Sequence, residues 1–394
     1  MGKQVAALVL CASILVALVQ GLVLRSAIAQ EESGDTDNGR QIAADPPAWF
    51  AANGQAVALF KKGKLRQALG AAKRAYRLYA EEKPFVADSY VTLVANAAAI
   101  AERLGGMQQA IRILGRAAAL LTPEDEERTV AIIQIRLTQA HGFDEAGRYQ
   151  DGQRMRLKAL TAAQKGLSKT DPCLAKIYLA LANHTKFIYD PALPARYLKQ
   201  AQEVVAGYPE DDPTRLLVAH AWAKFLIEIG KEGEAQKRLR AILAICDHSQ
   251  HALRRIRELV LGKLVFLAVK RGDDKRADAL LRQVIANAEP NGPAEALYTL
   301  LPKVPLVVER SGLVLAYDVN PQGRVTNIRV LTSSGSPQWE GKVREAMRRW
   351  RFKPAMKDGQ PVWSYNHRYR FTLLAERTVP TGSRIPTTRP PIRF

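Results

Sequence analysis

The chain has 394 residues, of which 47% are hydrophobic, so it is long enough for two or three domains and can support real cores. This composition excludes a wholly disordered chain. Its 58 Lys and Arg against 38 Asp and Glu give a formal net charge of +20, which suggests contact with nucleic acid, an anionic membrane surface or an acidic polymer.

Residues 1–29 have the layout of a targeting segment. Lys3 gives a positively charged start, an apolar run extends from Val5 to Leu24, and the segment ends with a small-x-small cleavage pattern at Ala29. The run is also long enough to span a bilayer, so a cleaved signal peptide and an inner-membrane anchor both stay open. Either outcome exports the remainder, which argues against nucleic acid as a partner.

Residues 30–47 are polar, and we expect a flexible lead-in there. From residue 48 to 290 the chain is rich in Ala and Leu with a helical period, and it contains an internal repeat of 42 residues. The repeat is marked by Ala56, Ala98, Ala140 and Ala182, by a following glycine (Gly63, Gly105, Gly147, later Gly230 and Gly272), and by a small residue five positions further on (Ala68, Ala110, Gly152, Ala235, Ala277).

This spacing predicts one helical hairpin per repeat, in about six repeats. The glycine ends the first helix or lies in the turn, and the small residues let the two helices cross closely. Such a unit cannot bury its apolar face alone, so neighbouring units are expected to stack into a solenoid. The pattern resembles tetratricopeptide repeats in a 42-residue form, and the resemblance implies a groove that binds peptides or partner proteins. An irregular helical bundle is the alternative.

The cysteines and histidines of the repeat region give no clear site. Cys173 and Cys246 lie about 70 residues apart in different repeats, and either two separate buried thiols or a disulfide is open. Cys246, His248 and His251 have a spacing that could hold a metal. They fall at an expected connection between helices with no second ligand cluster, so we interpret them as a polar turn.

Residues 300–376 predict a small α+β domain in the order strand, strand, helix, strand. Leu300 to Pro305 is the expected link, a first strand from Gly312 reaches a turn at Asn320 to Gly323, and a second strand follows from Val325 to Leu331. A helix is expected from about Gln338 to Arg349 and a last strand from Trp363 to Leu374. Residues 377–394 are expected to form a disordered tail.

Between this helix and the last strand, aromatic and basic residues alternate. Trp350 and Phe352 alternate with Arg351 and Lys353, which could indicate a nucleic-acid patch. We prefer a strand start with the aromatic residues in the core and the cations in solvent.

The C-terminal segment, about residues 303–376, resembles the C-terminal domain of the TonB energy-transducer family. The matching pieces are, in order, the strand from Gly312, Asp318 to Gly323, Ser333 to Gly335, Trp350 to Ala355, and Gly359 to Val362. The resemblance implies a periplasmic domain that pairs with an extended segment of a partner.

That pairing would be strand addition at an exposed sheet edge, to a segment of an outer-membrane transporter. As the last strand is the best candidate for this edge, the predicted partner-binding residues are Trp363, Tyr365, His367, Tyr369 and Phe371. The repeats would bind further envelope proteins.

Two departures from that family favour an alternative. Helical repeats stand where TonB proteins carry a long Pro-rich spacer, and the N-terminal apolar run contains no His to engage a proton-driven motor. The alternative is a periplasmic tetratricopeptide-repeat scaffold with no energy coupling.

Nothing in the sequence indicates an enzyme. There is no nucleophile elbow, phosphate loop or His-Glu-x-x-His helix, so we predict no catalytic residue, no metal and no cofactor. From Pro302 to the end, 17 Lys and Arg stand against six Asp and Glu, so contact with an anionic envelope surface is a further expectation.

Overall fold

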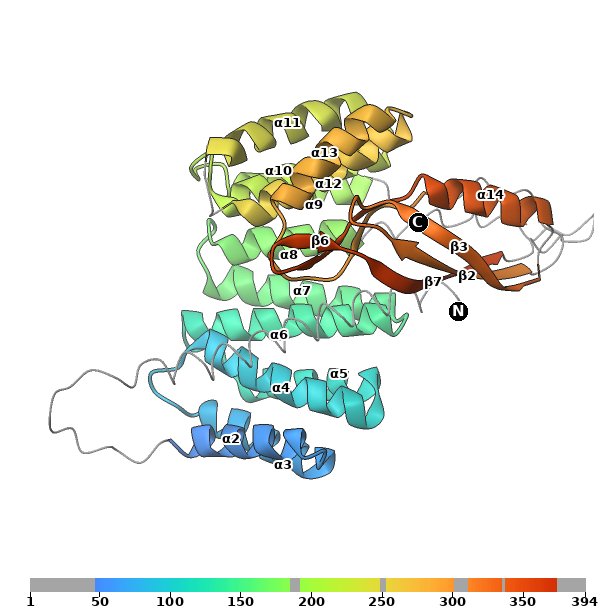
Figure 1. Cartoon of the computed structure of the whole chain (residues 1–394). Helices are drawn as coiled ribbons and strands as arrows, with labels where there is room; N and C mark the ends of the chain where they lie inside the picture. Colours follow the sequence, from blue (N-terminus) through green and yellow to red (C-terminus); the bar gives the residue numbers. More distant parts are fainter. Residues whose placement is uncertain (1–46, 185–191, 249–252, 301–310, 335–336, 374–394) are drawn as a thin grey trace, which may run out of the picture. The chain divides into compact units, whose positions relative to one another are not determined.

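The computed structural model describes residues 47–184, 192–248, 253–300, 311–334 and 337–373 (Figure 1). The chain divides into two compact units, with the division between Phe225 and Leu226. We describe each unit by itself.

Thirteen helices and seven strands are found in these residues. The helices are α2 (Ala48–Lys61), α3 (Leu65–Tyr79), α4 (Ala87–Gly105), α5 (Met107–Leu120), α6 (Glu126–Glu145), α7 (Tyr149–Gly166), α8 (Pro172–His184), α9 (Ala192–Val204), α10 (Pro213–Glu228), α11 (Glu232–His248), α12 (Arg254–Lys270), α13 (Asp274–Ala286) and α14 (Pro337–Arg348). The strands are β1 (Glu295–Tyr298), β2 (Ser311–Val319), β3 (Val325–Ser333), β4 (Arg351–Lys353), β5 (Ala355–Lys357), β6 (Gln360–Val362) and β7 (Ser364–Leu373).

The first unit is built from helical hairpins, as the repeat predicts. From α2 to α9 the helices pair in sequence order, and α3, α5 and α7 also pack against the first helix of the next hairpin. The predicted small positions in this unit are all buried: Ala56, Ala68, Ala98, Ala110, Ala140, Gly152 and Ala182. Small residues therefore occupy the lines along which the helices cross, and the predicted helical-repeat fold is confirmed.

Glycine turns join the helices of four hairpins in the same way. Gly63, Gly147, Gly230 and Gly272 have φ of 71°, 74°, 82° and 80°, a left-handed conformation that glycine adopts without steric cost. The next residue donates its N–H to a carbonyl five positions back, as from Lys64 to Leu59 at 2.9 Å. These bonds satisfy carbonyls that the end of the first helix leaves unpaired.

The second hairpin differs from these four in which glycine takes the left-handed conformation. Gly105 ends the first helix, which is one of the two predicted outcomes, and Gly106 takes the positive φ of 72°. Two successive glycines make either position available for the left-handed conformation, and the helix continues through the first of them.

In the second unit, the last helical hairpin and the C-terminal strands share one hydrophobic core. Leu261 and Val265 of α12 and Leu281 of α13 pack in the same buried cluster as Leu315 of β2 and Trp350. A domain boundary was predicted between residues 290 and 300. That boundary stays a prediction, and this core contains residues from both sides of it.

The long strands form a three-stranded antiparallel sheet in the order β3-β2-β7. The expected order of strand, strand, helix, strand is present as β2, β3, α14 and β7. Four short strands form two separate pairs, β1-β4 and β5-β6. The sequence analysis assigned no element to β1, which is only four residues long and pairs with a strand more than 50 residues away.

Four predicted segments and the two cysteines of the repeat region remain to be placed. No helix in the described ranges is long and apolar enough to cross a membrane. The predicted targeting segment 1–29, the lead-in up to residue 46, the link 301–305 and the tail 377–394 lie outside those ranges. Cys173 and Cys246 are free cysteines, the latter buried.

Candidate partner-binding strand

Strand β7 lies at one side of the three-stranded sheet. Its residues pair with β2 from Ser311↔Leu373 to Val319↔Ser364, and β3 pairs with the other side of β2. Within the described residues no strand pairs with the outer side of β7. Its outer N–H and C=O groups are therefore placed to accept a further strand.

A buried carboxylate fixes the geometry at the start of β7. Asp318 of β2 accepts bonds from the Asn366 N–H at 2.9 Å and the Asn327 side-chain amide at 2.8 Å, and Arg329 lies 3.7 Å from it. Asn366 and Asn327 both have positive φ, 58° and 49°, and the β2–β7 register shifts by one residue here. Asp318 thus supports one irregular position on each neighbouring strand.

The same bonds set the charge of Asp318. Burial acts to raise the pKa of its carboxyl, but the Asn366 N–H, the Asn327 amide and Arg329 outweigh burial and lower it. Asp318 is therefore an anion at neutral pH. From the sequence, Asp318 was named only as the start of a segment that carries the family resemblance, and this role was missed, although an acid within an apolar strand was a readable signal.

Beyond the shifted position, alternate side chains of β7 turn toward the core. Phe371 is buried, and Tyr369 lies 5.1 Å from Trp350, ring centre to ring centre. The His367 ring stacks on Tyr317 at 5.3 Å, and its Nε2 lies 2.6 Å from the Ser364 hydroxyl. Burial lowers the pKa of His367, with Asp318 acting in the opposite sense. These three predicted residues hold the strand in place.

Before the shifted position, the two remaining predicted residues are open to solvent. Trp363 and Tyr365 are 45% and 63% exposed, and their rings stack 5.9 Å apart and 6° from parallel. An exposed pair of this kind offers apolar area beside the outer edge of β7. The structure thus divides the five predicted residues into a core-facing group of three and an exposed pair.

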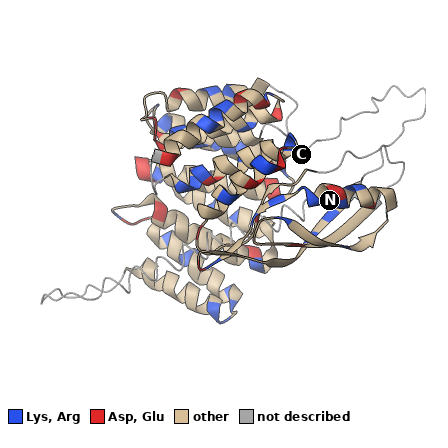
Figure 2. Cartoon of the chain, turned by 45° about the horizontal axis from the view of Figure 1, so that its top comes forward, with Lys and Arg blue, Asp and Glu red and all other residues tan. Residues whose placement is uncertain are grey.

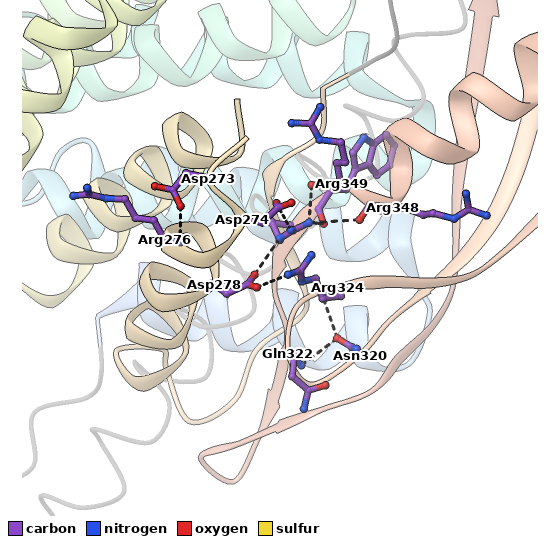
Figure 3. A network of polar contacts seen from close by, with 11 residues as sticks. Asp273, Asp274, Arg276, Asp278, Asn320, Gln322, Arg324, Arg348 and Arg349 are labelled. Carbon is purple, nitrogen blue, oxygen red and sulfur yellow. Dashed lines mark hydrogen bonds and ion pairs between the residues drawn. The ribbon is translucent and has the colours of Figure 1, made fainter. Parts of the chain in front are cut away.

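The two cations of β4 differ from the prediction in their burial. Arg351 and Lys353 were expected in solvent, and this is wrong, because both are buried. Arg351 lies 2.8 Å from Asp274 and 3.5 Å from Asp278, both on α13, and also donates to the Arg349 carbonyl. Asp278 also pairs with Arg324, which follows the turn after β2 (Figure 3). Carboxylates far away in the sequence make this burial tolerable.

Lys353 is buried in the same way. Its Nζ lies 2.6 Å from Glu258 of α12, itself buried, and 3.0 Å from Glu295 of β1. Glu258 shares a helix face with Leu261 and Val265, so a carboxylate on an apolar stripe was the signal that sequence reasoning missed. Each cation of β4 therefore connects the strand to the last helical hairpin.

The turn between β2 and β3 fits against β4 through a glycine. Gly323 has φ 72°, its carbonyl accepts from the Phe352 N–H at 2.9 Å, and an added Cβ would lie 2.1 Å from the Phe352 carbonyl oxygen. The Trp350 indole donates to the Leu300 carbonyl at 3.0 Å. The close contact between the backbones of Gly323 and Phe352 and the bond to Leu300 thus hold Trp350 where its ring contacts Tyr369 of β7.

The other residues considered for chemistry are not assembled into a site. In the part of the chain that the structure describes, no group of three His, Cys, Asp or Glu side chains is placed to hold a metal. Of the predicted polar turn, His251 lies outside that part.

Comparison with known proteins identifies this C-terminal segment. Residues 311–373 match the family model of the Gram-negative bacterial TonB protein C-terminal. Protein TonB of Escherichia coli is 45% identical over 38 residues, which are 10% of this chain and 16% of that protein. Protein TonB of Yersinia enterocolitica is 36% identical over 77 residues, 19% of this chain and 27% of that protein. The predicted resemblance is confirmed, and the chain matches under a third of either relative.

Two solved structures are similar to part of this chain. BtubC from P. vanneervenii is 16% identical with a TM-score of 0.46, covering 61% of this chain and 95% of that one. A Podosopora anserina protein with nearly identical TPR-like repeats is 19% identical with a TM-score of 0.39, covering 53% of this chain and 100% of that one. The repeat fold is assigned here from the hairpins themselves.

Proposed function

We propose that this protein is a TonB-like adaptor of the bacterial cell envelope, exported to the periplasm, with no catalytic activity. Its C-terminal domain would bind an extended segment of an outer-membrane transporter by strand addition to β7. Its helical repeats would bind further envelope proteins. The observation that carries the proposal is the unpaired outer side of β7, among the described residues, next to the exposed Trp363 and Tyr365.

Site-specific photo-crosslinking in native envelopes tests this proposal. A photoreactive amino acid at Tyr365 of the full chain should give a crosslinked product with an outer-membrane transporter, because the side chain projects beside the binding edge. The matched control places the same group at Lys342, which is exposed on α14. Equal products from both positions, or none from Tyr365, would refute strand addition at β7.

A second candidate function is a periplasmic scaffold with no energy coupling. It is supported by the core shared between the C-terminal strands and the last helical hairpin, which makes the domain part of a larger body. Solute uptake separates the two candidates. For a transducer, deleting the gene should abolish transporter-dependent uptake as strongly as collapsing the proton gradient does; for a scaffold, uptake should persist.

A further inference from the structure

In the first unit, positive charge is concentrated on the second helix of each hairpin. Helices α3, α5, α7 and α9 contain 12 Lys and Arg and only two Asp and Glu. The first helices, α2, α4, α6 and α8, contain five Lys and Arg and six Asp and Glu. Figure 2 shows Lys and Arg in blue and Asp and Glu in red on the described helices and strands. Among these eight helices, the net positive charge therefore resides on the second helix of each hairpin.

Contacts between successive hairpins also join helices of the same kind. Helix α4 packs against α6 and α6 against α8, so the first helices are neighbours. Helix α3 likewise packs against α5. The charge asymmetry in the sequence is thus an asymmetry between two sets of helices.

Four of the cations recur at corresponding positions of α5 and α7. Arg112 and Arg116 of α5 lie one helical turn apart, and Arg154 and Lys158 of α7 lie 42 residues further on. All four are exposed. Arg154 pairs with Asp151, whereas Arg112, Arg116 and Lys158 form no ion pair with a described carboxylate. These four residues are called the basic strip below.

Exposed leucines lie beside the basic strip. Leu120 is one turn beyond Arg116 and is 48% exposed, and Leu157 lies between Arg154 and Lys158 and is 40% exposed. Leu78 of α3 is 42 residues before Leu120 and is 37% exposed. Large apolar side chains and cations with long alkyl stems therefore share this side of the helices.

We propose that this face of the first unit docks on an anionic lipid surface. The cations of the basic strip would contact lipid phosphates, and the leucines would enter the boundary between head groups and acyl chains. The exposed leucines favour a lipid surface over a hydrated acidic polysaccharide, because a polysaccharide would leave these apolar side chains in contact with water. The proposal uses a surface distinct from β7 and does not depend on strand addition.

Vesicle binding tests the proposal with the full chain. The test variant carries Arg112→Gln, Arg116→Gln, Arg154→Gln and Lys158→Gln. The control variant removes the same charge from exposed positions off the strip, with Lys61→Gln, Lys62→Gln, Lys64→Gln and Lys176→Gln. Any contribution of residues 1–29 to binding is common to all the proteins compared. Circular dichroism confirms that each variant is folded.

The expected result is a loss of at least about tenfold in affinity for vesicles with 30% phosphatidylglycerol in the test variant, since each cation near such a surface contributes appreciably. The control variant should lose clearly less, and 500 mM salt should remove the difference. Equal losses in both variants, or equal binding to neutral phosphatidylcholine vesicles, would overturn the proposal.

A second variant separates lipid from other polyanions. Leu120→Ser with Leu157→Ser keeps the charge and should weaken vesicle binding while leaving binding to soluble dextran sulfate unchanged. If the leucine variant binds vesicles like the unaltered protein, the ligand is a polyanion other than lipid and the proposal is wrong.

Discussion

Lys353 and Glu258 form a buried ion pair whose partners come from β4 and α12, with Glu295 as a second carboxylate. The two buried charges neutralise each other. The effect of the pair on the free energy of unfolding is therefore seen when one partner is removed alone. Arg351 is neutralised in the same way by Asp274 and Asp278 of α13.

Lys353→Met should lower the free energy of unfolding by about 3–5 kcal/mol, because Glu258 is left buried without its cation. The double variant with Glu258→Leu should recover a large part of that loss. Urea denaturation of the three proteins measures both values. Additive effects of the two substitutions would show that the pair is not coupled.

The stability contributed by Asp318 should depend on pH in a defined direction. Its pKa is lower in the folded state, so its contribution is present above the ordinary Asp pKa of about 3.9 and is lost as pH falls through the folded value. Asp318→Asn should cost about 1–3 kcal/mol at pH 7. Between pH 5 and pH 2 the variant should lose less stability than the unaltered protein, as measured by urea denaturation. A parallel pH dependence would contradict the assignment.

At the scale of the elements, Gly152 tests why small residues recur along the repeats. A Cβ at Gly152 would lie 2.3 Å from the Asp144 carboxylate and 2.9 Å from the Ala140 carbonyl oxygen, so α6 and α7 would have to separate. Gly152→Ala should therefore lower stability by about 1–3 kcal/mol.

The matched control is Gly70→Ala on α3. No atom lies within 4 Å of the added Cβ, and alanine favours helix by up to about 1 kcal/mol over glycine. Thermal unfolding should move in opposite directions for the two variants. A loss of stability at both positions would argue against the steric explanation.

Patterns that recur locally were predictable from the sequence. The 42-residue spacing predicted the hairpins and their buried small residues, and alternation with turn chemistry predicted β2, β3 and β7. What sequence reasoning missed depends on distant contacts. Arg351 and Lys353 have the alternation of a solvated strand face, and only α12 and α13 supply the carboxylates that bury them. The shifted register at Asn366 likewise depends on Asp318.

At the scale of the whole molecule, we expect that the segment that matches the TonB family is not a complete folding unit. Residues 311–373 lack β1, Glu258, Asp274 and Asp278, which pair with β4. We expect residues 303–394 alone to be unfolded or aggregated and residues 226–394 to fold cooperatively. Circular dichroism and proton NMR of the two fragments check this. A well-dispersed spectrum from the shorter fragment would refute it.

The ion pairs of β4 have a mechanical consequence if a partner strand binds β7 and is pulled. The load would act along the β2–β7 hydrogen bonds in shear, and these bonds would share it. Through the aromatic contacts of Trp350 and the salt bridges of Arg351 and Lys353, the pull would continue into α12 and α13. Helices α12 and α13 would then bear the tension. A substitution that removes the salt bridges of Lys353 would lower the rupture force without changing the binding edge.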